Sequence, residues 1–166
     1  MEEEREADGS PSPALKRDLI MAWNVRKPIL VPYDFSSHSR LAVDKALALA
    51  DSPSCVHVLH VLPSFVPLAP EGFPLESIDD SVRLDSAQKS LEEDFADQRY
   101  AGVAREVLIG DPGTVCADRA ETLDAELIVV PSHGRSGVSR LLLGSVAERI
   151  IRLSKRPVLV LKIPHD

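Results

Sequence analysis

The segment IVVPSHGRSGVSRLLLGSVAERI, from Ile128 to Ile150, contains the pattern that decides the fold. A continuous apolar run, typical of a buried strand, changes abruptly into Gly, Ser, Arg and His and then becomes apolar again. Small and donor-rich residues after such a strand indicate a loop at its carboxyl end. Gly144 and Ser145 fall at or near the start of the helix that follows. The segment therefore predicts a strand, a loop and a helix.

Similar units occupy most of the chain. Apolar runs predict strands at Ile29–Val31, Cys55–Leu62, Glu126–Val130 and Pro157–Leu161, and an alternating pattern predicts a strand at Val103–Gly110. Helical patterns occur at Ser39–Ala50, with Ser36 or Ser37 as its cap, at Asp79–Tyr100 and Pro112–Leu123, and in a final helix that ends at Ser154. Continuous apolar strands are buried on both faces. We therefore predict an α/β fold, a single open five-stranded parallel sheet with helices on both faces, in the manner of Rossmann-like domains.

Composition limits the partners that this chain can have. Its 166 residues carry a formal net charge of −7, so no general basic field attracts nucleic acid or an anionic membrane. No apolar run approaches the roughly 18 residues that span a bilayer, and the acidic N-terminus does not resemble a signal peptide. The two cysteines, Cys55 and Cys116, lie in apolar stretches and are interpreted as buried structural thiols. These features favour a cytoplasmic protein with neither a nucleic-acid nor a membrane partner.

Two segments fall outside the regular pattern. Residues 1–26 are acidic and then rich in Ser and Pro, so we expect a flexible N-terminal extension followed by one domain at 27–163. Within the extension, Leu15, Leu19 and Trp23 have helical spacing, which leaves a docked helix and a frayed tail both open. The Pro-rich stretch 63–74 is too long for a simple connection and is expected to be functional or mobile.

The chemistry of the loop after Ile128–Val130 suits an anion. Its glycines (Gly134 and Gly137) permit close backbone approach, its serines (Ser132, Ser136 and Ser139) supply hydroxyls, and its arginines (Arg135 and Arg140) supply positive charge. Free N–H groups at the start of the next helix, near Gly144 and Ser145, favour a phosphate. The alternative is a surface loop that merely connects strand to helix.

This arrangement resembles the universal stress protein family, whose hallmark is G-x2-G-x9-G-[ST] after the fourth strand. Gly134, Gly144 and Ser145 match the hallmark, and Pro131 replaces its first glycine. The resemblance extends over ILVPYDFS (29–36), VLHVL (58–62), IGDP (109–112) and RPVLVLK (156–162). It implies a domain similar to the adenine nucleotide alpha hydrolases.

The resemblance also implies a site for an adenine nucleotide, ATP or AMP, with Mg²⁺ accompanying ATP. Carried over to this sequence, the binding residues are Asp34, Val61, Ser132, His133, Gly134, Arg135, Gly144 and Ser145. Taken alone, Asp34 could equally cap a helix or form a turn, and Val61 could simply be a core residue. Family members commonly pair the last strand, here 157–162, with its copy, so a homodimer is expected.

Pro131 is the departure from the family pattern. Proline has no N–H and fixes φ near −65°, so a ligand contact through this backbone position is lost. The alternative is a strand terminator without effect on the ligand.

The sequence favours binding over catalysis. It has no G-x4-G-K-[ST] loop to place a lysine at the β- and γ-phosphates. His60 and His133 are interpreted as positioning or packing residues rather than proton-transfer groups. We therefore predict no catalytic residues and no metal ligands, with slow ATP hydrolysis left open. The other hypothesis is a nucleotide-free interaction protein of the same fold.

Overall fold

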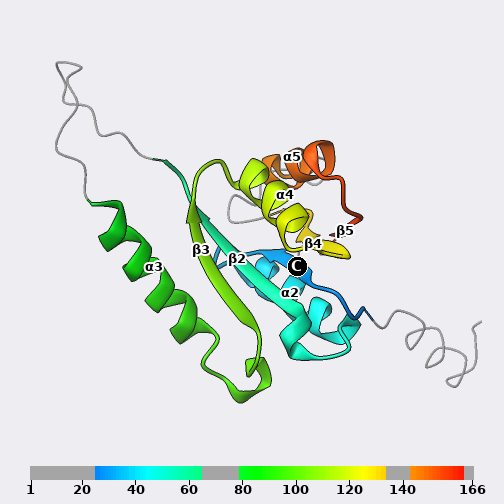
Figure 1. Ribbon diagram of the computed structural model, residues 1–166, viewed down its shortest axis with the longest axis horizontal. Helices are drawn as coiled ribbons and strands as arrows, with labels where there is room; N and C mark the ends of the chain where they lie inside the picture. The colour runs from blue at the N-terminus through cyan, green and yellow to red at the C-terminus, as the bar shows by residue number, and fades with distance from the viewer. Residues whose placement is uncertain (1–24, 65–78, 134–142, 163–166) are drawn as a thin grey trace, which may run out of the picture.

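The computed structural model describes residues 25–64, 79–133 and 143–162. In these ranges five parallel strands form one sheet in the order β3-β2-β1-β4-β5 (Figure 1). The strands are β1 (Ile29–Pro32), β2 (Val56–Leu62), β3 (Ala104–Ile109), β4 (Leu127–Pro131) and β5 (Val158–Leu161). This confirms the predicted open five-stranded parallel sheet.

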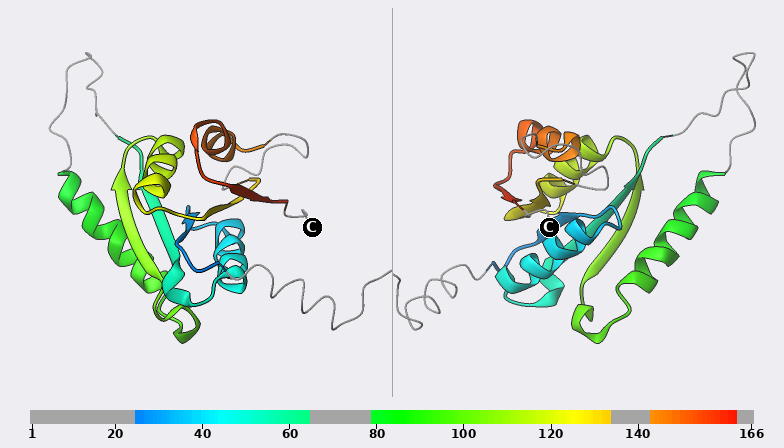
Figure 2. Two further views of the ribbon diagram at one scale, coloured as in Figure 1. Left: turned by 45° about the vertical axis from the view of Figure 1, so that its right-hand side comes forward. Right: turned by 180° about the vertical axis from the view of Figure 1, so that it is seen from behind.

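Helices cover both faces of the sheet (Figure 2). They are α2 (Ser37–Leu49), α3 (Asp80–Asp94), α4 (Pro112–Thr122) and α5 (Ser145–Leu153), and two short 3-10 turns, η1 (Pro53–Cys55) and η2 (Gln98–Tyr100), lie between elements. Helix α2 begins after Ser36, whose side chain accepts a hydrogen bond from the N–H of Ser39. Helix α4 begins with Pro112 after the capping side chain of Asp111.

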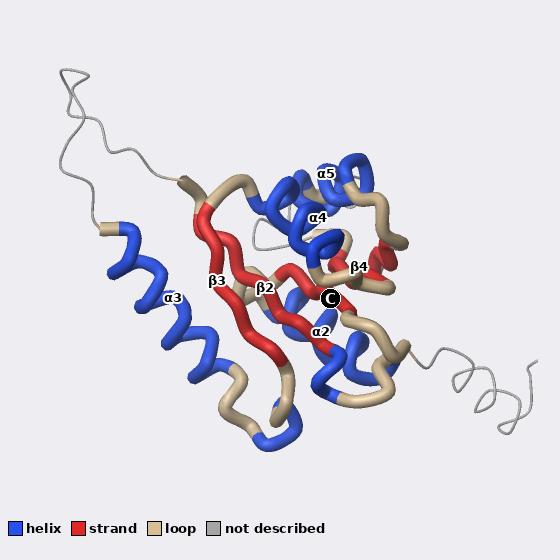
Figure 3. The backbone as a smooth tube through the Cα atoms, in the orientation of Figure 1, coloured by secondary structure: helices blue, strands red, loops and turns tan. Residues whose placement is uncertain are grey.

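The core consists of two layers, because successive strand residues point to opposite faces. On one face, Ile29 and Val31 of β1 pack with α2 and with the carboxyl end of α3. On the other face, Leu30 of β1 packs with α4 and α5. Figure 3 shows α3 standing apart from α4 and α5.

The two central strands separate toward their carboxyl ends. Within the described strands, β1 pairs with β4 only as far as Leu30 and Ile128. By contrast, β1 stays paired with β2 up to Pro32, and β4 stays paired with β5 up to Pro131. The order of the strands reverses between β1 and β4, which is where open α/β sheets bind ligands. The fold therefore opens the sheet at its expected binding position.

Helix α3 is shorter than the sequence predicts. It ends at Asp94, and the chain then turns so that Asp97 caps η2. The prediction of a helix up to Tyr100 is wrong because this turn places Tyr100 in the core beside Phe95, with ring centroids 4.8 Å apart. Val82, in the first turn of α3, is 59% exposed.

The described chain begins with a residue that packs on the domain. Val25 is buried, its N–H donates to the carbonyl oxygen of Leu49, and its own carbonyl oxygen accepts from the N–H of Asp51. Val25 thus lies within the packed body although it precedes the predicted boundary at residue 27. Residues 1–24 of the predicted extension, which include the helix hypothesis at 15–23, and most of the Pro-rich stretch lie outside the described residues.

Candidate functional site

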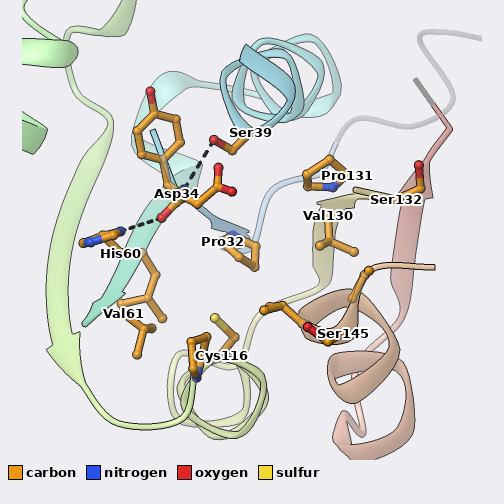
Figure 4. A pocket seen from close by; sticks show the side chains of 16 residues that line it. Pro32, Asp34, Ser39, His60, Val61, Cys116, Val130, Pro131, Ser132 and Ser145 are labelled. Carbon is orange, nitrogen blue, oxygen red and sulfur yellow. Dashed lines mark hydrogen bonds between the residues drawn. The ribbon is translucent and has the colours of Figure 1, made fainter. Parts of the chain in front are cut away.

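A pocket of about 290 Å³ lies where β1 and β4 separate (Figure 4). The described residues that line it are Pro32, Tyr33, Asp34, Ser39, Leu59, His60, Val61, Pro112, Cys116, Val130, Pro131, Ser132, Gly144, Ser145, Val146 and Ala147. Its volume is at the lower end of small-molecule sites, about 300 to 1,000 Å³. Apolar walls with a few convergent polar groups are typical of such sites. The pocket therefore has the position and character of a ligand site.

Asp34 lies in the pocket and also orders the loop between β1 and α2. Its Oδ1 accepts hydrogen bonds from the backbone N of Ser36 at 3.0 Å and from Ser36 Oγ at 2.5 Å. Its own N–H donates to Ser39 Oγ at 3.3 Å, a bond that Figure 4 marks. The turn-forming and pocket-lining interpretations of Asp34 are thus compatible, because the same carboxylate group does both.

His60 holds the backbone beside Asp34. Its Nδ1 lies 2.7 Å from the carbonyl oxygen of Tyr33. Because a carbonyl oxygen only accepts, Nδ1 carries a proton and donates. This contact gives His60 a positioning role.

Ser132 and Gly144 join the end of β4 to the start of α5. The N–H of Ser132 donates to the carbonyl oxygen of Leu161 at 2.8 Å, and the carbonyl oxygen of Ser132 accepts from the N–H of Gly144 at 2.7 Å. Ser132 is itself 8% exposed. The expectation of a free amide is therefore wrong for Gly144, whose N–H is used to hold the backbone together.

The first turn of α5 forms another wall of the pocket. Gly144 is the N-cap and offers no capping side chain, and Ser145, Val146 and Ala147 line the pocket. The first amides of a helix and its dipole give this end positive character. The pocket thus combines the carboxylate of Asp34 with an opposite, electropositive helix end.

An apolar wall faces these polar groups. Val61 of β2, Val130 of β4 and Cys116 of α4 belong to one buried cluster and line the pocket. Burial, and then the nearby charge of Asp111, raise the pKa of the Cys116 thiol to about 12. Cys116 therefore stays protonated and acts as a small apolar side chain, as the sequence predicted, although its place in the pocket was not predicted.

Pro131 costs the sheet no hydrogen bond. The amides of Ile128 and Ser132 both donate toward β5, at Pro157 and Leu161 respectively. Alternation along the strand directs the nitrogen of Pro131 to the other side, toward β1, where pairing has already ended. The proline is therefore compatible with the sheet. Its missing N–H removes a possible donor only from the pocket.

The structure brings together five of the eight residues expected at the site. Asp34, Val61, Ser132, Gly144 and Ser145 line the pocket. His133 is described, but the pocket lining does not include it, and its Nδ1 lies 3.1 Å from Ser132 Oγ. The remaining two, Gly134 and Arg135, lie outside the described residues.

Residues that sequence reasoning missed come mainly from α4 and from the ends of the strands. Pro112 and Cys116 approach the pocket because α4 starts beside the carboxyl end of β2. The IGDP segment (109–112) was the available signal for Pro112. Among the described residues, no group of three or more His, Cys, Asp or Glu side chains could hold a metal ion. None of the described helices has the length and apolarity to cross a membrane.

Comparisons with a family model and with known sequences point to the same family. The universal stress protein family model matches residues 26–162. The universal stress protein MJ0531 of Methanocaldococcus jannaschii is 35% identical over 147 residues, which is 85% of this chain and 85% of the relative. Rv2623 of Mycobacterium tuberculosis, also a universal stress protein, is 33% identical over 147 residues, and the match covers 86% of this chain but only 48% of that longer protein.

Solved structures with the same fold include two nucleotide complexes. A universal stress protein in complex with cAMP is 22% identical with a TM-score of 0.55, covering 84% of this chain and 99% of the other. The universal stress protein from Archaeoglobus fulgidus in complex with dAMP is 24% identical with a TM-score of 0.53, covering 83% and 99%. These likenesses establish the fold. Together with the family match over nearly the whole described chain, they show that the protein belongs to the universal stress protein family.

Proposed function

We propose that this chain is an adenine-nucleotide-binding module, with ATP or AMP as its ligand. The observation that carries the proposal is the pocket between the separated ends of β1 and β4, where Asp34, Val61 and Ser132 meet the first turn of α5. The complexes of two family members with cAMP and dAMP support the same ligand class. In this proposal the nucleotide orders the site and changes the surface offered to partners in a stress response.

The pocket lining suits the two ends of a nucleoside. Val61, Cys116 and Val130 form an apolar wall of the kind that accepts a flat base. Asp34 offers carboxylate oxygens, which accept hydrogen bonds from hydroxyl groups such as those of a ribose. We therefore assign the base to the apolar wall and the sugar to Asp34.

The phosphate end belongs to the start of α5. Helix starts bind anions through their first N–H groups and their dipole, and Ser145 adds a hydroxyl. Because the amide of Gly144 is occupied by Ser132, the donors for a phosphate begin at Ser145. The contribution of Arg135 stays a prediction, as does Mg²⁺ accompanying ATP.

Binding rather than catalysis is the activity that the pocket supports. Of the described lining residues, His60 is the only histidine, and its Nδ1 is committed to Tyr33. The test has two parts: heat-denatured protein is analysed for released adenine nucleotide, and purified protein is assayed for ADP production. We expect the denatured protein to release adenine nucleotide in a stoichiometric amount. We expect the purified protein to show no multiple-turnover production of ADP. Rapid ADP production that is lost in Asp34→Ala would contradict this assignment.

We also propose that the module is a homodimer through 157–162. The supporting observation is that β5 lies at the edge of the sheet, with all four of its residues partly exposed. An edge strand presents unpaired backbone groups to a second chain. The cytoplasmic location stays a prediction of the sequence.

A nucleotide-free interaction module is the second candidate. Pro131 supplies no N–H to the pocket and Gly144 has already used its own, so two backbone positions of the hallmark offer no donor to a phosphate. The analysis of released nucleotide, together with a titration of the purified protein with ATP and AMP, separates the candidates, because this one predicts neither released nucleotide nor binding of added nucleotide.

A further inference from the structure

Asp34 lies between Tyr33, whose backbone is hydrogen-bonded to β2, and Phe35, whose backbone is in the left-handed region. The N–H of Tyr33 donates to the carbonyl oxygen of Leu59 at 2.8 Å, and the carbonyl oxygen of Tyr33 accepts from His60 Nδ1 at 2.7 Å. On the other side, Phe35 has a φ of 64°, in the left-handed region. The backbone direction at Asp34 is therefore imposed by its neighbours on both sides.

The conformation of Phe35 needs support from its surroundings. A bulky residue in the left-handed region is unfavourable and persists only where the structure around it enforces it. The Phe35 ring packs edge-on against Tyr33, with centroids 5.3 Å apart, and against His60, with centroids 4.8 Å apart. Tyr33 is the common element, because it holds Phe35 through its ring and His60 through its carbonyl oxygen.

The side chain of Tyr33 connects this loop to a helix outside the pocket. Its hydroxyl donates to the carboxylate of Asp94, the last residue of α3 and 61 positions further along the chain. Burial, and then the hydrogen bond to Asp94, raise the pKa of Tyr33 well above its ordinary value of 10.0, so the hydroxyl keeps the proton that it donates.

Asp94 is itself fixed by Arg40 of α2. The two side chains form an ion pair, and Arg40 Nη1 also donates to the carbonyl oxygen of Asp94 at 2.8 Å. The guanidinium lies over the ring of Phe95, 4.8 Å from its centroid, an arrangement favourable for a cation. Asp94 thus joins α2, the end of α3 and Tyr33.

We infer that Asp94 is a positioning residue for the ligand-binding carboxylate of Asp34, acting through Tyr33 from outside the pocket. The expected effect of Asp94 on nucleotide affinity rests on the proposed function. The effect of Asp94 on the loop can be measured without any nucleotide. Loss of the Asp94 contact frees the Tyr33 ring, weakens the support of Phe35 and loosens the turn that aims Asp34.

The first test uses the backbone N–H of Ser36, which donates to Asp34 Oδ1 at 3.0 Å. Amide hydrogen exchange followed by NMR, without nucleotide, is compared for Tyr33→Phe, Asp94→Asn and the control Glu93→Gln, an exposed acid on the same turn. We expect exchange at Ser36 to be about threefold faster or more in the first two variants, and unchanged in the control. The amide of Ser132, bonded to β5, reports general destabilisation and should not change.

Unchanged exchange at Ser36 in both variants would overturn the inference, as would an equal acceleration at Ser132. Tyr33→Phe removes only the hydroxyl, so it keeps the test decisive if Asp94→Asn folds poorly. If wild-type protein binds neither ATP nor AMP, the proposed function fails, and the exchange result still decides whether Asp94 positions the loop.

The second test measures AMP affinity by calorimetry in a double-mutant cycle. We expect Tyr33→Phe or Asp94→Asn to weaken AMP by about threefold to tenfold, with no change in Glu93→Gln. In an Asp34→Asn background the same substitutions should have little further effect, because their action passes through Asp34. Equal losses in both backgrounds would show a merely structural role and refute the inference.

Discussion

The N–H of Gly144 donates to the carbonyl oxygen of Ser132 over 2.7 Å and holds the start of α5 against the end of β4. The φ of Gly144 is −63°, so glycine is not needed for its backbone angle. Space favours glycine instead, because a Cβ atom there would lie 3.2 Å from the same oxygen of Ser132, a tight contact that a shift of the backbone would have to relieve. The motif glycine at this position therefore allows two backbone segments to approach closely beside the pocket.

Gly144→Val should displace the start of α5 from Ser132. Because the phosphate is assigned to that helix end and the base is not, we expect ATP binding to weaken about tenfold or more, and adenosine binding by less than about threefold. Calorimetric titrations with both ligands measure the difference. Equal weakening of the two ligands would count against a phosphate site at α5.

Pro131→Gly should tighten ATP binding by several-fold. The restored N–H would point toward the separated side of β1 rather than into the ladder with β5, where it is available to a ligand. A hydrogen bond to a charged group is worth roughly 1.5 to 3 kcal/mol, and the added flexibility of glycine offsets part of it. Pro53→Gly, at the start of η1 and outside the pocket lining, is the control. Unchanged affinity in Pro131→Gly would show that the missing donor is irrelevant.

Val160→Asp should convert the expected homodimer into a monomer. The substitution places a charge on the edge strand that is proposed to pair with its copy, where burial of an unpaired charge is unfavourable. Val82→Asp, at an exposed position of α3, should leave the mass unchanged. Analytical ultracentrifugation at tens of micromolar decides the matter, and a monomeric wild-type protein would refute the proposed dimer.

Ionised Glu106 should stabilise the folded protein, and the free energy of unfolding should fall in acid as Glu106 becomes protonated. Burial alone would raise its pKa, but hydrogen bonds from Arg119 at 2.8 Å and with His57 at 2.7 Å outweigh this and leave the pKa below the ordinary value of 4.5. A pKa lowered on folding stabilises the protein above the unfolded value, and this stabilisation is lost as the pH falls through the folded value. Urea unfolding between pH 6 and about pH 3 should therefore show a shallower loss of unfolding free energy in Glu106→Gln than in wild type. Glu93→Gln should follow the wild-type curve, and identical slopes in all three proteins would contradict the prediction.

The fold could be predicted from the sequence because its strands are continuous apolar runs. β1 and β4 begin and end within one residue of the predicted bounds, since a strand buried on both faces has no polar interruption. The end of α3 could not be predicted in the same way. The polar helical pattern continues beyond Asp94, and only the tertiary burial of Tyr100 shows where the chain must turn.

The site was predictable only where it lies next to a motif. Asp34 and Ser132 follow β1 and β4, which are neighbours in the sheet, so their location at the same sheet edge follows from the parallel strand order. Cys116 carries no such signal, because its helical position fits an ordinary core residue equally well. Asp94 is still harder to find, since its contact with Tyr33 joins segments 61 residues apart.

Calorimetric titration of the wild-type protein with AMP and ATP tests the central claim most directly. The proposed function predicts saturable binding with one site per chain, and competition between the two nucleotides for the pocket lined by Asp34 and Ser145. Binding should be weakened strongly in Gly144→Val. If nucleotide-free, folded protein shows no saturable binding of either nucleotide, the pocket is not an adenine-nucleotide site and the interaction-module candidate replaces it.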